Sequence, residues 1–288
     1  MFVLRSNPEL TDAWEHHIRP IHYYEPLPDF REVTADQTLR RRESPAIAFD
    51  LEAQVELQAR LGRSYGAEVS ALADRGDFTF RNGYFDGLDA ALYYGLIRDL
   101  KPRRVIEIGS GFSTRIAAKA LARNLDEGSP GELICIEPFP EPRLTAAQLP
   151  ITLVRERVEQ LPLDRFEYLQ ANDVLFIDSS HALKFGGDVY REFLEILPVL
   201  RPGVWVHVHD IFFPHDYPAE WMIEKRFGFN EQYLLEAFLA FNTAFKASCG
   251  LHWLWSEHRD ALKASWPPAV TSAMGPLGPA SFWMKRVG

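Results

Sequence analysis

The stretch Val105-Ile-Glu-Ile-Gly-Ser-Gly-Phe-Ser-Thr114 combines a short apolar run with a glycine turn. The apolar residues of the run are β-branched or aliphatic, as in the buried strands of parallel sheets. Gly109 and Gly111 allow the backbone to turn sharply and to approach a ligand closely. Ser113 or Thr114 can then cap a helix. The stretch therefore predicts a strand, a turn and a helix whose first backbone N–H groups can hold a ligand.

This turn differs from a dinucleotide-binding turn, which needs a third small residue where Thr114 stands. Glu107 adds a carboxylate beside the turn, which disfavours a pyrophosphate and suits an ammonium group. In this respect the sequence resembles the class I S-adenosylmethionine-dependent methyltransferases. The resemblance implies that Glu107 holds either the turn or the methionine ammonium of the cofactor. It also implies cofactor contacts from Gly109, Ser110, Gly111, Ser113 and Asp178.

A second carboxylate follows the next apolar run, residues 133–136, at Glu137. Its spacing from the glycine turn is close to the roughly 20 residues at which related folds place a ribose-binding acid. A carboxylate can accept hydrogen bonds from both ribose hydroxyls. Val158 and Glu159, which follow the third predicted strand, are candidates for adenine contacts.

Strands and helices alternate along most of the chain, which is typical of a parallel sheet with helices on both faces. We predict an α/β fold with a Rossmann-like class I methyltransferase sheet of seven mostly parallel strands. Besides the two strands above, the pattern predicts strands over 151–154, 173–178, 204–209, 251–256 and 280–285. It predicts helices over 46–73, 86–100, 185–197 and 231–246.

The chain divides near residue 75. Residues 1–45 are rich in proline, histidine and aromatic residues without a period, which predicts an irregular arm with a short helix over 9–17. We therefore expect an N-terminal extension over 1–75 and a methyltransferase domain over 76–288. The Arg40–Arg42 cluster is expected in a solvated loop. Asn82, Tyr84 and Phe85 follow the boundary, and either close over the cofactor or belong to the core.

The composition favours a cytoplasmic enzyme. Hydrophobic residues make up 47% and charged residues 25% of the 288 residues, as in globular proteins. The net charge of −9 argues against a nucleic-acid partner. No apolar run approaches the roughly 18 residues of a membrane-spanning helix, and no secretory signal is apparent. The two cysteines, Cys135 and Cys249, form no disulfide framework.

Acidic residues end four of the predicted strands: Glu107, Glu137, Asp178 and Asp210. Parallel strands present their carboxyl ends at one edge of a sheet, which is where such folds bind ligands. The stretch His207-Val-His-Asp-Ile-Phe-Phe-Pro-His-Asp-Tyr-Pro218 is unusual because a buried strand leads directly into histidines and acids. If the fourth and fifth strands are neighbours, about 4.8 Å apart, Asp178 meets His209 and Asp210 there.

Three interpretations of this cluster remain open. In the first, Asp178, His209 and Asp210 bind Mg²⁺, which would hold substrate hydroxyls and lower the pKa of one of them. In the second, no metal binds, and His181 or His209 is a general base oriented by Asp178 or Asp210. In the third, the residues form a hydrogen-bonded polar cluster that ends the strands.

The runs Phe176-Ile-Asp-Ser-Ser-His181 and Pro202-Gly-Val-Trp-Val-His-Val-His-Asp-Ile-Phe213, with the glycine turn, resemble bacterial methyltransferase family 24 over about residues 78–288. Related metal-dependent O-methyltransferases of macrolide sugars carry acids where Asp178 and Asp210 stand. His209 departs from that pattern, because an acid is usual there. The resemblance implies S-adenosylmethionine-dependent methylation of a small molecule or sugar hydroxyl, with catalytic roles for His181, His209 and Asp210.

Aromatic residues near the C-terminal strands and the glycine turn leave other functions open. Phe212, Phe213, Tyr217 and Trp221 can line a substrate pocket, or can form the contact of a homo-oligomer, since aromatic residues are enriched at interfaces. One alternative is a non-catalytic binding or oligomerisation scaffold on a methyltransferase fold, which the four strand-end acids argue against. Another is a nicotinamide-dependent oxidoreductase, which Glu107 and the missing third small residue disfavour.

Overall fold

The computed structural model describes residues 21–43, 47–76, 78–142 and 149–288. The expected helix over 9–17 lies outside these residues. The chain divides into two compact units, of which the smaller comprises Met1–Arg40 and Tyr217–Gly228 and the larger Arg41–Asp216 and Phe229–Gly288. In the smaller unit, Thr34 caps the short helix α3 (Ala35–Leu39) and accepts a hydrogen bond from the Gln37 N–H. The larger unit holds the sheet and is described below.

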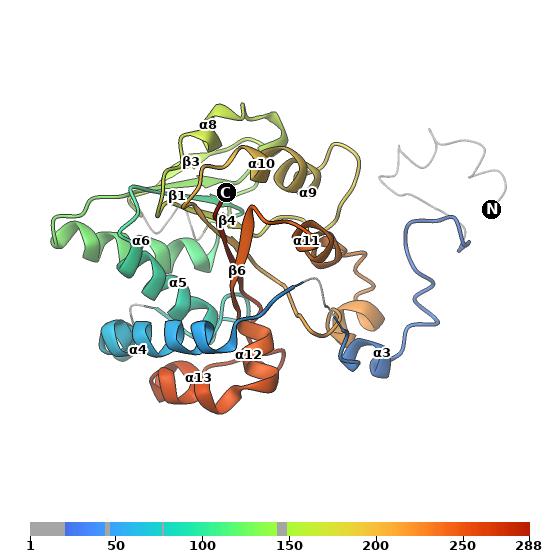
Figure 1. The fold of residues 1–288 in the computed structure, drawn as a ribbon, viewed down its shortest axis with the longest axis horizontal. Helices are drawn as coiled ribbons and strands as arrows, with labels where there is room; N and C mark the ends of the chain where they lie inside the picture. The colour runs from blue at the N-terminus through green and yellow to red at the C-terminus, as the bar shows by residue number, and fades with distance from the viewer. Residues whose placement is uncertain (1–20, 44–46, 77, 143–148) are drawn as a thin grey trace. The chain divides into compact units, whose positions relative to one another are not determined.

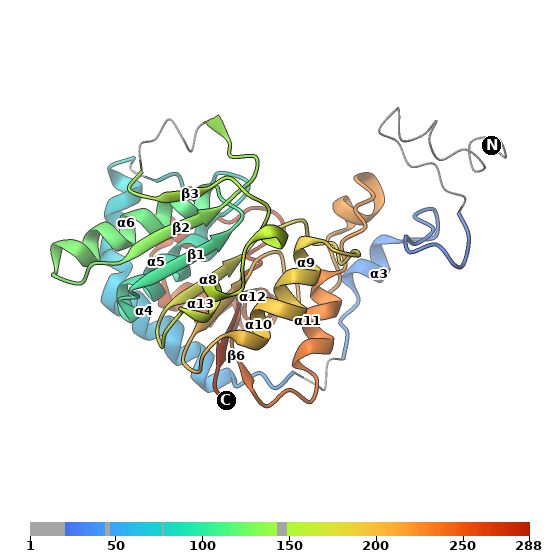
Figure 2. The same ribbon diagram turned by 90° about the horizontal axis from the view of Figure 1, so that it is seen from above.

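A seven-stranded sheet in the order β3-β2-β1-β4-β5-β7-β6 forms the centre of the larger unit (Figures 1 and 2). Neighbours from β3 to β5 are parallel, and β7 is antiparallel to both β5 and β6. This confirms the predicted Rossmann-like, mostly parallel sheet. The strands are β1 (Arg104–Ile108), β2 (Glu132–Ile136), β3 (Thr152–Val154), β4 (Val174–Ile177), β5 (Trp205–Val208), β6 (Phe245–Gly250) and β7 (Phe282–Arg286).

Helices cover both faces of this sheet (Figure 1). One face packs against α4 (Leu51–Asp74), α5 (Gly87–Leu100), α6 (Phe112–Asp126), α12 (Leu251–Glu257), α13 (Arg259–Ser265) and α14 (Pro268–Thr271). The other packs against η1 (Val158–Gln160), α8 (Asp164–Glu167), α9 (Asp188–Arg191), α10 (Leu197–Val199) and α11 (Glu231–Leu239), with a π-helical turn over Glu192–Ile196 joining α9 to α10. No helix among the described residues is both long and apolar enough to cross a bilayer.

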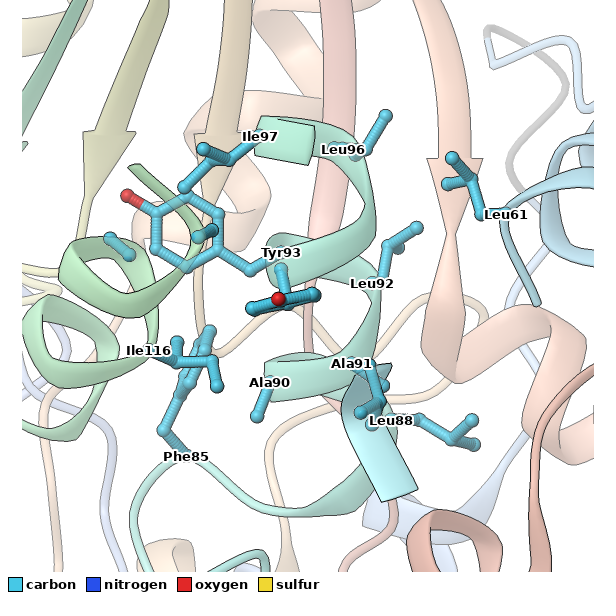
Figure 3. Close-up of a cluster of buried hydrophobic side chains, with 14 of the residues drawn as sticks. Leu61, Phe85, Leu88, Ala90, Ala91, Leu92, Tyr93, Leu96, Ile97 and Ile116 are labelled. Carbon is cyan, nitrogen blue, oxygen red and sulfur yellow. The ribbon is translucent and has the colours of Figure 1, made fainter. Parts of the chain in front are cut away.

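Helix α5 is buried on all sides rather than along one face (Figure 3). It lies between the sheet, α4 and α6, so that an apolar stripe would not be enough. Tyr93 of α5 stacks on Phe176 of β4 with ring centroids 5.1 Å apart. Phe85, just before the helix, contacts the same Phe176 ring edge-on at 5.8 Å. The core under the carboxyl ends of the strands is therefore aromatic.

Two predictions for the C-terminal region were wrong. The helix predicted over 231–246 ends at Leu239, and strand β6 begins at Phe245. The strand predicted over 251–256 is helix α12. Its apolar and aromatic residues suggested a strand, but Leu251, Trp253 and Leu254 are buried at helical spacing. Strand β6 has only a weak apolar pattern and is stabilised by antiparallel pairing with β7.

The expected solvated loop at Arg40–Arg42 was also wrong for its last residue. The Arg42 side chain is only 18% exposed and forms an ion pair with Glu236 at 2.8 Å. Its guanidinium lies 5.2 Å from the centre of the Tyr233 ring. Arg42 therefore anchors the chain to helix α11, because a buried guanidinium needs charged and aromatic partners.

Candidate functional site

The turn after β1 requires a glycine at its first position. Gly109 has φ +87°, and a Cβ atom there would lie 2.0 Å from the carbonyl oxygen of Asp178. Gly111 is different, because a Cβ atom there would meet nothing within 4 Å. Helix α6 begins at Phe112 with Gly111 as its N-cap, so neither Ser113 nor Thr114 has the capping position expected from the sequence. The turn thus leaves open space in front of the helix N-terminus.

Glu107 is fully buried beneath this turn. Its carboxylate accepts hydrogen bonds from the Tyr93 hydroxyl at 3.0 Å and the Thr114 hydroxyl at 2.5 Å. The Thr114 oxygen also accepts from the Gly111 N–H at 3.0 Å, which links the strand to the helix. Burial raises the pKa of Glu107 to about 7. Glu107 was expected to hold either the turn or the methionine ammonium, and these hydrogen bonds fit the first role.

Two neighbouring cavities open at the carboxyl ends of β1, β2 and β4. The first, of about 480 Å³, is lined by Tyr84, Phe85, Gly109, Ser110, Gly111, Phe112, Ser113, Glu137, Glu141, Pro142 and Asp178. The second, of about 400 Å³, includes Val158 and Glu159 and shares Gly109, Glu137 and Asp178 with the first. Most residues expected to contact the cofactor therefore line one of these cavities; the buried Glu107 and Asn82 line neither.

Glu137 lines both cavities, and backbone N–H groups fix its side chain. Its carboxylate accepts hydrogen bonds from the N–H groups of Ser110 at 3.3 Å and Phe139 at 2.8 Å. One of these donors belongs to the glycine turn and the other follows β2. The carboxylate is thus held at the point where a ligand spanning both cavities would pass.

The acids and histidines at the ends of β4 and β5 come together, as the sequence predicts. His181 Nε2 lies 3.4 Å from both Asp178 Oδ1 and Asp210 Oδ2. His209 Nδ1 lies 3.6 Å from Asp178 Oδ1 and 3.5 Å from Asp210 Oδ1. His207, on the same strand face, stays in the core and stacks on Trp283 with ring centroids 4.4 Å apart. We call Asp178, His181, His209 and Asp210 the acid–histidine cluster.

Three members of this cluster present donor atoms to one point. One ligand atom each of Asp178, His181 and Asp210 lies within 4.8 Å of the others. The expected metal set contained His209 in place of His181. Two carboxylates and one imidazole form a donor set that suits a divalent cation, so these residues fit the metal that the resemblance implies.

Charge coupling in the cluster shifts its pKa values strongly. Burial acts to lower the pKa of His209, but Asp210 and Asp178 outweigh it and raise that pKa to about 10. Burial also acts to lower the pKa of His181, but the contacts with Asp178 and Glu231 outweigh burial and raise this pKa. Burial raises the pKa of Asp210. The carboxylates of the cluster therefore favour the protonated forms of both imidazoles.

Sequence reasoning missed the carboxylates around this cluster. Glu231, at the start of α11, lies 2.8 Å from His181 Nδ1 and is buried. Glu192, in the π-helical turn, accepts a hydrogen bond from the Ser179 hydroxyl at 3.1 Å. Asp89 of α5 is also buried and accepts from the Ser281 N–H at 2.9 Å. Each comes from a distant part of the chain, so no local motif pointed to it.

The strand order and the two cavities at the strand ends are consistent with the Rossmann-like fold of class I methyltransferases, and a comparison of sequences points to the same class. The model of methyltransferase family 24, described as a methyltransferase domain, matches residues 106–211. This confirms the resemblance inferred from the motifs. An uncharacterized protein of Archaeoglobus fulgidus is 28% identical over 166 residues, which cover 53% of this chain and 74% of that protein.

Solved structures show more distant likeness. An O-methyltransferase from Bacillus cereus in complex with SAH is 14% identical, with 81% of this chain and 100% of that chain covered and a TM-score of 0.42. The MycE methyltransferase of mycinamycin biosynthesis, in complex with Mg and SAH, is 18% identical, with 59% and 44% covered and a TM-score of 0.38.

Proposed function

We propose that this chain is an S-adenosylmethionine-dependent methyltransferase that acts on a hydroxyl oxygen of a small molecule or sugar. The observation that carries the proposal is the position of Asp178. It lines both cavities beside the glycine turn and is also a member of the acid–histidine cluster. A cofactor bound in the cavities would therefore lie directly beside the charged groups that act on the acceptor.

The cofactor-binding part rests on backbone groups and one carboxylate. The start of α6 borders open space at Gly111, and Ser110 and Ser113 line the cavity. Glu137 would accept hydrogen bonds from the ribose hydroxyls, and Val158, which lines the second cavity, would contact the adenine. When bound, the sulfonium of S-adenosylmethionine supplies an electrophilic methyl group, so the protein mainly positions the partners and removes a proton.

The acceptor part rests on the acid–histidine cluster. Asp178, His181 and Asp210 would hold a divalent cation, which when bound lowers the pKa of a coordinated hydroxyl. His209 borders this set and is the group placed to take the hydroxyl proton once its own proton has been displaced. The acceptor oxygen would then form a bond to the methyl carbon as the bond from that carbon to sulfur breaks, and S-adenosylhomocysteine would leave.

Thermal unfolding with S-adenosylhomocysteine, with and without Mg²⁺, tests this proposal. A ligand at about 100 times its dissociation constant stabilises the folded state by roughly 2.7 kcal/mol, which gives a clear rise in Tm. We expect a rise with S-adenosylhomocysteine and a further rise with Mg²⁺. If only the first occurs, a metal-free histidine base replaces the metal mechanism. If neither occurs and NADH raises Tm instead, the chain is an oxidoreductase. If no ligand raises Tm, the chain is a scaffold.

The cytoplasmic location and the homo-oligomer that the sequence suggests stay predictions.

A further inference from the structure

The loop after β4 is fastened to the start of helix α11. His181 adopts a left-handed backbone conformation, with φ +57°. Its carbonyl oxygen accepts hydrogen bonds from the N–H groups of Asn230 at 2.9 Å and Glu231 at 3.2 Å. The Asn230 side chain accepts in turn from the Leu183 N–H at 2.6 Å. These contacts fix the backbone at His181 and at Leu183.

The same helix start also fixes the His181 side chain. Glu231 Oε2 lies 2.8 Å from His181 Nδ1, and the Glu231 side chain is only 1% exposed. Phe229 packs edge-on against the imidazole, with ring centroids 5.0 Å apart. With Nδ1 held by Glu231, the other ring nitrogen, Nε2, points between Asp178 and Asp210.

We propose that Glu231 is a positioning residue that orients His181 as a cation ligand together with Asp178 and Asp210. This inference rests on the proposed function and adds to it a division of work between the two histidines. An imidazole that donates Nδ1–H to a carboxylate presents its lone pair at Nε2, and such partners raise the basicity of metal-bound histidines. His181 is thus the ligand, and His209 is left for proton transfer.

The surroundings of His209 support this division. Its ring nitrogens make no hydrogen bond within the part of the chain that the structure describes. Its ring lies against Phe85, with centroids 5.1 Å apart, and its Nδ1 lies 3.5 to 3.6 Å from the Asp210 and Asp178 carboxylates. These contacts are longer than the 2.8 Å contact by which Glu231 holds His181.

A purely structural role for Glu231 does not account for its contacts. An acid in the first turn of a helix stabilises the helix dipole from an exposed position. Glu231 is instead buried, and its Oε2 contacts an imidazole in the acid–histidine cluster. Burying a carboxylate in this way is costly unless a partner balances it.

The test uses the full chain without added cofactor and the variants Glu231→Gln and Glu231→Leu. Glu236→Gln is the matched control, because Glu236 lies on the same helix and pairs with Arg42 instead. Three quantities are measured: Mn²⁺ affinity by electron paramagnetic resonance, the ¹⁵N shifts of the His181 ring by NMR, and S-adenosylhomocysteine affinity by calorimetry. If Glu231→Leu fails to fold, the conservative Glu231→Gln still provides the answer.

We expect Glu231→Gln to lose about 10- to 100-fold in Mn²⁺ affinity and to move the His181 Nδ1 signal, with S-adenosylhomocysteine affinity unchanged. The Glu236→Gln variant should match the wild type in all three. Unchanged Mn²⁺ affinity and an unmoved Nδ1 signal in Glu231→Gln would overturn the inference. If the wild type binds S-adenosylhomocysteine but no Mn²⁺, the metal part of the proposed function and the ligand role of His181 both fail; a wild type that binds neither shows that the proposed function itself has failed.

Discussion

The carboxyl ends of β1 and β2 and those of β4 and β5 are built in opposite ways. At β1 and β2, backbone groups and small side chains surround open cavities, and the one buried acid, Glu107, is bonded beneath the turn. At β4 and β5, charged side chains converge with little space between them. The comparison teaches that one edge of a sheet can hold a large ligand with its backbone and act on a second ligand with fixed charges.

The largest expected effect concerns the carboxyl ends of β4 and β5, which carry the acid–histidine cluster. Asp210→Asn keeps the size of the side chain but removes its charge from the acid–histidine cluster, where Asp210 lies 3.4 Å from His181. We expect turnover to fall by at least about 100-fold, as for loss of a catalytic acid or base, with S-adenosylhomocysteine affinity nearly unchanged. Release of S-adenosylhomocysteine with a panel of hydroxylated acceptors measures this. Full activity would show that the two ends do not differ in function.

The next effect concerns the backbone of the glycine turn after β1. Gly109→Ala would place a Cβ atom 2.0 Å from the Asp178 carbonyl oxygen at a φ of +87°. Strain and overpacking together should lower the free energy of unfolding by about 4 kcal/mol, measured by urea denaturation. Gly111→Ala is the control, because its Cβ meets nothing within 4 Å and should reduce only cofactor affinity. Equal stability of the two variants would contradict the described turn.

Glu107 should make the free energy of unfolding depend on pH. Burial raises its pKa from 4.5 to about 7, so the folded state holds this proton more tightly than the unfolded state. Its contribution to stability is complete below pH 4.5 and is lost as the pH rises through about 7, a difference of about 3 kcal/mol. In Glu107→Gln that part of the pH dependence should vanish. Urea denaturation between pH 4.5 and 8 checks this, and parallel curves for both proteins would be the contrary result.

The smallest effect concerns cofactor contacts. Glu137→Ala removes a carboxylate expected to bind the ribose hydroxyls, so S-adenosylhomocysteine affinity should fall by roughly 10- to 100-fold. Glu132→Ala is the matched control, because Glu132 lies at the exposed start of β2, the strand that Glu137 follows. Glu107→Ala should weaken binding through the turn. Calorimetric affinities that are unchanged in both the Glu107 and Glu137 variants would remove the cofactor assignment.

The first part of the sheet was predictable because its signals are local. Apolar β-branched runs followed by glycine or acidic residues predict the ends of β1, β2, β4 and β5, and the structure bears these out. The sixth strand was assigned to the wrong residues. Strand β6 alternates weakly and depends on its pairing with β7, so tertiary contacts rather than its own sequence determine its conformation.

The site was predictable to the extent that strand ends imply convergence. Parallel topology alone brings Asp178 and Asp210 together, which the sequence indicated. The burial of Glu107 and the contact of Glu231 with His181 were not accessible in this way. They depend on how α5 and α11 pack, because 50 residues separate Glu231 from His181.

The place of β7 in the sheet also fixes an order of assembly. This strand follows all the others along the chain but lies between β5 and β6. The Ile211 N–H, directly after Asp210, donates to the Ala280 carbonyl at 2.9 Å. During synthesis the edge of β5 therefore stays unpaired until β7 arrives, and an apolar unpaired edge can pair with other chains. The free edge of β5 can therefore be paired only after β7 has been synthesised, whereas the glycine turn contacts segments that are made earlier.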